Sequence, residues 1–171
     1  MKVIGAVLVM VASCGIGFLF ASELNKRKRE LEEQYSLMSF LLGDIRYMRD
    51  TLSEAVSKAI TRHKGSYTGF LKLISDMLCE SSGQSLSEIW GVSVEKGLKQ
   101  SSLTESDKQR LRRFGEEIAF TDSESIIMHF EEYLRDLKEE IDGAGRVVGT
   151  KAKLYRSLGI LAGVFIVVLF I

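Results

Sequence analysis

The first apolar segment, residues 3–22, reads VIGAVLVMVASCGIGFLFAS and contains no charged side chain. Twenty helical residues at about 1.5 Å each extend ~30 Å, the thickness of the hydrocarbon core of a bilayer. A second uncharged segment, SLGILAGVFIVVLFI, occupies residues 157–171. It reaches only about 22 Å, so the flanking Lys and Arg side chains must snorkel to complete a span. We therefore predict transmembrane helices at 1–22 and 157–171, with a polar domain at 23–156 between them.

Basic residues flank the polar domain at both ends. Lys26, Arg27, Lys28 and Arg29 follow the first apolar segment, and residues 146–156 hold four more cations and no acid. The positive-inside rule then places the middle domain in the cytoplasm and both termini on the far side of a cell membrane. The same cations would form a collar against anionic lipid head groups.

The N-terminus has two other interpretations. A cleaved signal peptide has a shorter apolar region, and here a strongly basic segment follows it. The run Val11-Ala12-Ser13-Cys14 fits the loose pattern of a lipid-modified cysteine, but seven more uncharged residues follow Cys14. The other cysteine, Cys79, lies in an expected helix, so the chain has no disulfide framework.

The middle domain has helical periodicity throughout and no proline, the residue that most often breaks helices. A long first helix is expected to continue from the membrane to about residue 50. Its apolar stripe holds Leu31, Tyr35, Met38, Leu42 and Ile45. Three capping boxes then open further helices, at residues 51–54, 85–88 and 104–107. We predict an all-α domain, a compact bundle of about six helices flanked by the two membrane helices, with Trp90, Phe70 and Phe114 in its core.

The sequence contains no motif that favours an enzyme. The chain has 23 Lys plus Arg against 23 Asp plus Glu, so it lacks the basic excess of a nucleic-acid binder. It has no phosphate-binding glycine-rich loop, and His63 and His129 lack the spacing of metal ligands. We expect no catalytic residue, no metal and no cofactor.

Two sets of residues are candidates for protein contacts. In the membrane segments, small residues recur every four positions at Ser13, Gly17 and Ala21 and at Gly159 and Gly163, a spacing that lets helices pack closely. In the middle domain, residues 105–142 hold twelve acids and six bases. The acids that could form a docking face for a basic partner are Glu116, Glu117, Glu124, Glu131, Glu132, Glu139 and Glu140.

Both sets have alternatives. The membrane helices could pack on each other or on a neighbouring subunit, so a homo-oligomer is compatible with the sequence. The acids could instead form a solvated face with i,i+4 ion pairs such as Glu131–Arg135.

Several segments resemble the stage III sporulation protein AB family in their order and spacing. They are the N-terminal helix with its basic exit, residues 51–55 (TLSEA), residues 88–90 (EIW), residues 111–116 (LRRFGE) followed by Asp122, and residues 153–163. The resemblance covers essentially the whole chain. The helical domain is also similar to the cytoplasmic domains of the inner-membrane platform protein of type II secretion and type IV pilus systems.

The resemblance implies a non-enzymatic platform within the channel between mother cell and forespore, located in the outer forespore membrane. Its implied partners are other channel proteins and a secretion-type ATPase, the sporulation protein AA, held at the membrane. Two other functions stay open: a membrane-bound regulator or sensor, and an enzyme whose site has no recognisable motif.

Overall fold

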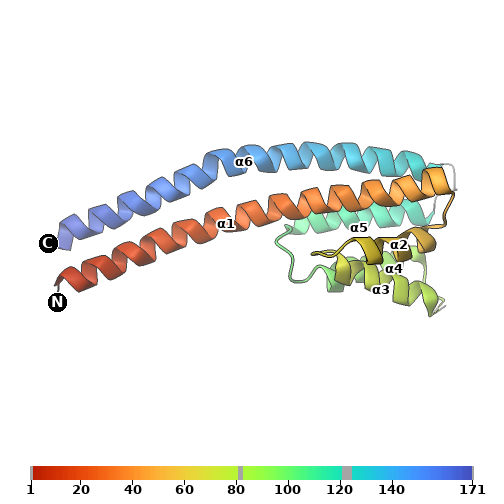
Figure 1. Cartoon of the computed structure of the whole chain (residues 1–171), viewed down its shortest axis with the longest axis horizontal. Coiled ribbons are helices and arrows are strands. Elements are labelled where there is room, and N and C mark those ends of the chain that lie inside the picture. Colours follow the sequence, from red (N-terminus) through yellow and green to blue (C-terminus); the bar gives the residue numbers. More distant parts are fainter. Residues whose placement is uncertain (1, 81–82, 121–124, 171) are drawn as a thin grey trace. The chain divides into compact units, whose positions relative to one another are not determined.

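The computed structural model describes the backbone of residues 2–80, 83–120 and 125–170, and the side chains of residues 19, 22–80, 83–120, 125–150, 157 and 161. Throughout this part of the chain every regular element is helical, as the sequence predicts (Figure 1). The elements are α1 (Lys2–Gly43), the π-helix η1 (Asp44–Met48), α2 (Leu52–Arg62), α3 (Thr68–Cys79), α4 (Leu86–Gly97), α5 (Glu105–Ala119) and α6 (Ser125–Phe170).

The chain divides into two compact units, and the long helices α1 and α6 contribute to both. One unit consists of the outer ends of these helices, up to Lys28 and from Asp142. Within it Ala144 is buried, and a Cβ added to Gly145 would lie 3.5 Å from Lys28 Cε, so the two helices pack side by side there. The second unit, residues 29–141, is the helical bundle.

The predicted membrane segments are helical in their backbone, because α1 includes residues 3–22 and α6 includes residues 157–170. Nearly all side chains of these segments lie outside the described residues, and so do Ser13, Gly17, Ala21, Gly159 and Gly163. Among the described residues, no helix has the length and apolar character needed to cross a membrane.

All three predicted capping boxes are present in the bundle. In each box, the side chain of the first residue accepts a hydrogen bond from the backbone N–H of the residue three positions later. The backbone N–H of the first residue in turn donates a hydrogen bond to the side chain of that later residue. The pairs are Thr51 with Glu54, Ser85 with Glu88, and Thr104 with Asp107. These bonds satisfy N–H groups that have no partner within the helix, which fixes where α2, α4 and α5 begin.

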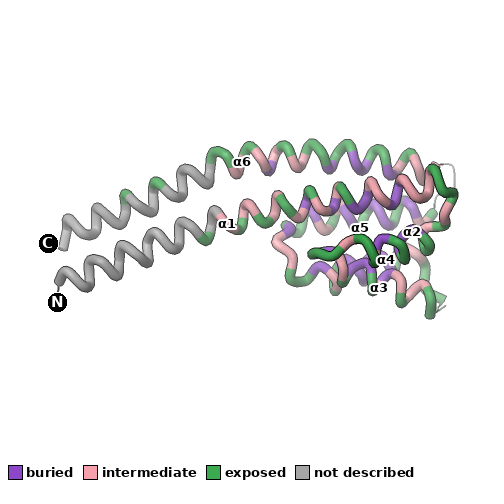
Figure 2. The backbone as a smooth tube through the Cα atoms, in the orientation of Figure 1, coloured by how far each residue is buried: buried purple, intermediate pink, exposed green. Residues whose placement is uncertain are grey.

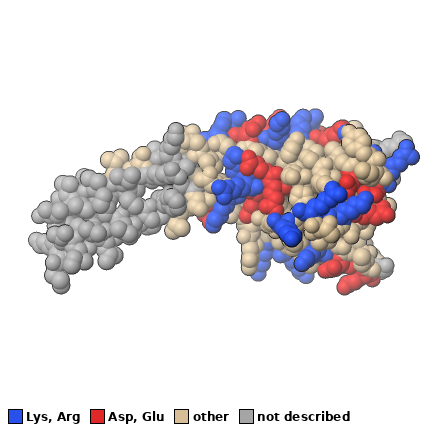
Figure 3. Space-filling model, in the orientation of Figure 1, with Lys and Arg blue, Asp and Glu red and all other residues tan. Residues whose placement is uncertain are grey.

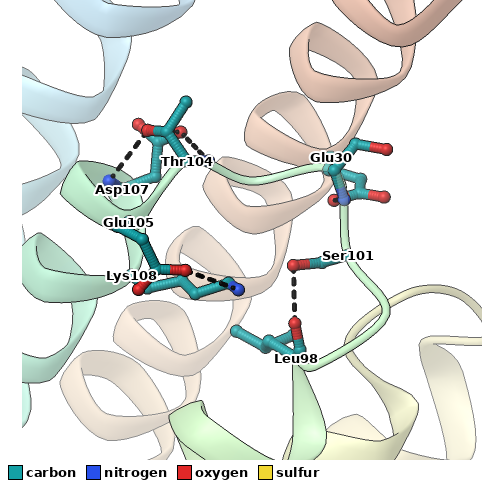
Figure 4. A network of polar contacts seen from close by, with 8 residues as sticks. Glu30, Leu98, Ser101, Thr104, Glu105, Asp107 and Lys108 are labelled. Carbon is teal, nitrogen blue, oxygen red and sulfur yellow. Dashed lines mark hydrogen bonds and ion pairs between the residues drawn. The ribbon is translucent and has the colours of Figure 1, made fainter.

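The loop between α4 and α5 is held from both sides (Figure 4). The Ser101 hydroxyl donates to the Leu98 carbonyl oxygen at 2.7 Å, which turns the chain away from α4. The Ser102 N–H donates to Glu30 Oε2 on α1 at 2.8 Å, 72 residues away in sequence. The loop therefore holds the start of α5 in a fixed position beside α1.

A line of aromatic rings forms the centre of the bundle, where the buried residues gather on the inner sides of the helices (Figure 2). Successive rings meet edge to face with centroids 4.8–6.3 Å apart. The line passes through Tyr67, Phe70, Trp90, Phe114 and Phe130. Because these residues come from the start of α3 through α4 and α5 to α6, the rings join elements that are far apart in sequence.

Trp90 is fully buried, as predicted, and its Nε1–H donates to the Leu111 carbonyl oxygen at 2.9 Å. The indole lies directly against Gly115, where an added Cβ would be 2.1 Å from Trp90 Cδ1. A similar close approach occurs between α3 and α4, where a Cβ on Gly97 would be 2.6 Å from the Phe70 Cα. Glycine at these two positions lets the helices approach to this distance.

The buried face of α1 differs from the predicted stripe. Tyr35 and Ile45 are only half-buried. The residues that the bundle buries are Leu31, Gln34, Leu37, Met38, Leu41 and Leu42. Gln34 is inside because its amide nitrogen donates to the Tyr133 hydroxyl of α6 at 2.7 Å. The predicted face was slightly wrong, because a pattern of apolar residues leaves out a polar residue, such as Gln34, that is buried with a hydrogen-bond partner.

Candidate functional site

The predicted acidic face lies on α5 and α6, two helices that pack antiparallel in the bundle. Arg110 on α5 pairs with Glu140, and Glu117, two turns later, pairs with His129, so the partner number falls as the chain advances. The described members of the face are Glu116, Glu117, Glu131, Glu132, Glu139 and Glu140. Glu124 lies outside the described residues. The structure thus brings six of the seven predicted acids onto one helical pair.

A groove of about 320 Å³ runs between the two helices within this face. Its floor is formed by Phe114 and Tyr133, whose ring centroids are 4.5 Å apart. Its charged walls are Arg110, Arg113, Glu117, Glu132 and Asp136, together with His129. Two of the predicted acids, Glu117 and Glu132, line the groove together with Asp136 and three basic side chains.

Five of the six described acids have a basic partner within the bundle. The partners are Arg112 for Glu116 (3.6 Å), His129 for Glu117 (3.9 Å), Arg46 for Glu131, Arg135 for Glu132 (3.5 Å) and Arg110 for Glu140 (3.3 Å). The pair Glu131–Arg135, an example of the solvated-face alternative, is not formed, since Glu131 reaches Arg46 of η1, but the i,i+4 pair Arg112–Glu116 of the same kind is present. The contact between Arg46 and Glu131 could not be seen in a helical pattern because it joins residues 85 positions apart.

The electrostatic effect of these pairs is local. The hydrogen bond from Arg46 to Glu131 raises the pKa of the arginine, which is charged at any physiological pH in either case. Exposed ion pairs of this kind contribute little to stability, because water and salt screen them and two long side chains must be held in one geometry. Lys and Arg are mixed with Asp and Glu over the described surface that faces the viewer (Figure 3). The acids can therefore exchange their internal partners for those of another protein at little cost in stability.

The two histidines show no catalytic arrangement. His63 packs its ring against Phe40 with centroids 5.8 Å apart, and His129 is partly buried beside Glu117. No group of three or more His, Cys, Asp or Glu side chains within the described residues is placed to hold a metal ion. Burial raises the pKa of Tyr67, which keeps this inner hydroxyl neutral.

One feature of the site could not be found by counting charges. Four large apolar side chains of the bundle, Tyr47, Met48, Phe120 and Met128, are exposed. Tyr47 and Met48 are adjacent in η1, Phe120 directly follows α5, and Met128 lies in the first turn of α6. The only available signal is their position, near the junctions between helices.

Comparison with known proteins gives a consistent result. The family model described as stage III sporulation protein AB matches residues 2–171. Stage III sporulation protein AB of Bacillus subtilis (strain 168) is 27% identical over 169 residues, which is 99% of this chain and 98% of that protein. A solved structure of stage III sporulation protein AB (SpoIIIAB) is similar in fold, with a TM-score of 0.66 and 22% identity, and the match covers 72% of this chain and 97% of that one.

Proposed function

Because the chain belongs to the stage III sporulation protein AB family, we propose that it is a non-enzymatic platform of the transenvelope channel that links mother cell and forespore. A sporulation role follows from the family. The platform role is our proposal, and it assigns the helical bundle to the cytoplasm and the two chain ends to the outer forespore membrane. Its direct partners would be other channel proteins.

The two apolar ends support membrane attachment. Each is a continuous helix in its backbone, each is free of charge over fifteen residues or more, and each is followed or preceded by basic residues on the bundle side. A bundle held at both ends is fixed close to the membrane surface, where its basic flanks contact anionic lipid. Small residues four apart would let the two helices pack on each other or on a neighbouring subunit.

The partner that we propose for the bundle is a secretion-type ATPase, the sporulation protein AA. The observation that supports this proposal is the groove between α5 and α6, where the carboxylates of Glu117, Glu132 and Asp136 line a surface that a partner can reach. Lys and Arg of a partner could replace the weak internal ion pairs of Glu116, Glu132 and Glu140. A docked ATPase would then act at the membrane without any catalytic group from this chain.

Charge reversal tests this proposal in the full chain reconstituted in lipid nanodiscs. The variant with Glu132→Lys and Glu139→Lys, both exposed on α6, should weaken ATPase binding at least about tenfold. The matched control is Asp76→Lys with Glu95→Lys, which makes the same charge change at exposed positions of α3 and α4. Equal binding by the two double variants would place the docking surface elsewhere.

A membrane-bound regulator or sensor is the alternative function. It would need a ligand site coupled to the membrane helices, and no observation on the described residues favours one.

A further inference from the structure

The part of α6 that directly follows the bundle, residues 143–150, has a poor sequence for a helix. It reads GAGRVVGT, and six of its eight residues are Gly, Val or Thr, which favour a helix less than Ala does. Each glycine alone lowers the helical population about fivefold relative to alanine. Residues 125–141, the part of α6 within the bundle, contain no glycine. By composition, therefore, α6 becomes weak where it leaves the bundle.

Packing does not require these glycines. A Cβ added to Gly149 would meet no atom within 4 Å. One added to Gly143 would meet only Arg146 Nη2, at 3.9 Å. One added to Gly145 would meet only Lys28 Cε, at 3.5 Å. These are ordinary van der Waals distances to flexible side chains, so alanine would fit at all three positions and close approach of a neighbour does not explain the glycines.

Tertiary contacts do little to hold the segment. Within residues 143–150, whose side chains are all described, only Ala144 is buried. None of these side chains forms an ion pair with another described residue. In the bundle, by contrast, α6 buries Phe130, Tyr133, Leu134 and Leu137. Helical segments with few buried apolar contacts open locally at a low cost in free energy.

The other long helix, α1, has no such weak segment. Its residues 18–42 contain no glycine. Just outside the bundle, the Lys26 ammonium lies 3.2 Å from the Glu23 carboxylate, an i,i+3 pair within the helix. Of the two helices that lead out of the bundle, only α6 therefore combines poor helix formers with few contacts.

We propose that residues 143–150 form a joint in α6. The helical hydrogen bonds of the joint open and close more readily than those of the bundle, and the part of α6 beyond it can then change direction while α1 stays a continuous helix. A partner bound to the bundle could be moved in this way without unfolding the bundle. The inference goes beyond the proposed function and holds for any partner, because it concerns α6 itself.

Amide hydrogen exchange of the full chain in lipid nanodiscs, measured by mass spectrometry, tests the opening. The test variant carries Gly143→Ala, Gly145→Ala and Gly149→Ala. The matched control is Gly43→Ala, the same change at the end of α1, where a Cβ also meets no atom within 4 Å. All the added methyl groups fit, so both variants should fold.

In the parent, we predict that residues 143–150 exchange at least about tenfold faster than residues 133–141. The test variant should slow the exchange of residues 143–150 by up to about a hundredfold, or about fivefold for each glycine, and the control should leave it unchanged. Exchange in the parent that is as slow as in residues 133–141 would overturn the proposal. Fast exchange that the three alanines do not slow would overturn it too.

Spin labels test whether the opening changes the direction of the helix. The labels are attached at Lys138→Cys and Ser157→Cys, two exposed positions of α6, in a chain with Cys14→Ser and Cys79→Ser. In a continuous helix these positions lie about 29 Å apart. We predict a broad distribution with shorter distances in the parent and a narrow one near this value in the test variant. Equally narrow distributions would show that α6 opens without bending, and the joint would be refuted.

Discussion

Replacing Gly115 by Ala has two opposing effects on the stability of the bundle. In an ordinary helix the change is favourable by about 1 kcal/mol, because glycine loses more conformational freedom on folding than alanine does. Here the new Cβ would lie 2.1 Å from Trp90 Cδ1 and 2.7 Å from Nε1, well inside van der Waals contact. Trp90 is fully buried among aromatic rings, so the indole cannot move without disturbing the core.

The magnitude follows from these contacts. Overpacking of a core costs about 1–3 kcal/mol. Displacing the indole also weakens its 2.9 Å hydrogen bond to the Leu111 carbonyl oxygen, a further loss of about 1 kcal/mol. After the gain in helix propensity is allowed for, we expect Gly115→Ala to destabilise the bundle by about 1–3 kcal/mol. For a chain of this size, the melting temperature should fall by about 2–12 °C.

Gly143→Ala is the matched control on α6. Its Cβ would meet only Arg146 Nη2 at 3.9 Å, so we expect stabilisation by up to about 1 kcal/mol. Thermal unfolding of the full chain in detergent, followed by circular dichroism, compares the two variants. Trp90 is the only tryptophan, so its fluorescence reports separately on the core. If both variants gain stability, the close packing of α4 on α5 would be refuted.

Two further predictions concern polar groups. Tyr67→Phe should leave the free energy of unfolding unchanged or raise it slightly, because the buried Tyr67 hydroxyl has no hydrogen-bond partner among the described residues. Tyr133→Phe should lower the free energy of unfolding by about 1–3 kcal/mol, because it leaves the Gln34 amide without its acceptor. Equal melting temperatures for the two variants would contradict this. Two hydrogen bonds lower the pKa of Glu54, the larger effect coming from the Thr51 backbone N–H and the smaller from the Thr51 hydroxyl. The stability that these bonds contribute is therefore fully present above the ordinary pKa of a glutamate, and it is lost as the pH falls through the lowered pKa of Glu54. The Glu54→Gln variant should therefore be less stable than the parent near neutral pH and equally stable in strong acid. Denaturant titrations measure this, and a difference in the free energy of unfolding that does not depend on pH would count against the capping role.

Local rules predicted much of the bundle. The boundaries of α2, α4 and α5 follow from capping boxes, since Thr51, Ser85 and Thr104 each satisfy N–H groups within three residues of themselves. The core position of Trp90 follows equally from helical spacing. Such features depend on neighbours in sequence, and therefore a single sequence is enough to find them.

Long-range partners could not be predicted in this way. Gln34 is buried because of Tyr133, 99 positions later, and Glu131 pairs with Arg46 rather than with a residue of its own helix. The exposure of Phe120 and Met128, two large apolar side chains near helix ends, was not predicted either.

We propose that the bundle lies in the cytoplasm, attached to the membrane through both of its ends, where an ATPase can bind it. Protease treatment of intact protoplasts, and then of lysed ones, tests this location most directly. We predict that the bundle, residues 29–141, is protected until lysis and is cleaved afterwards. Cleavage in intact protoplasts would place the bundle outside the cell, where no ATP-driven partner can bind it, and would contradict the proposed function.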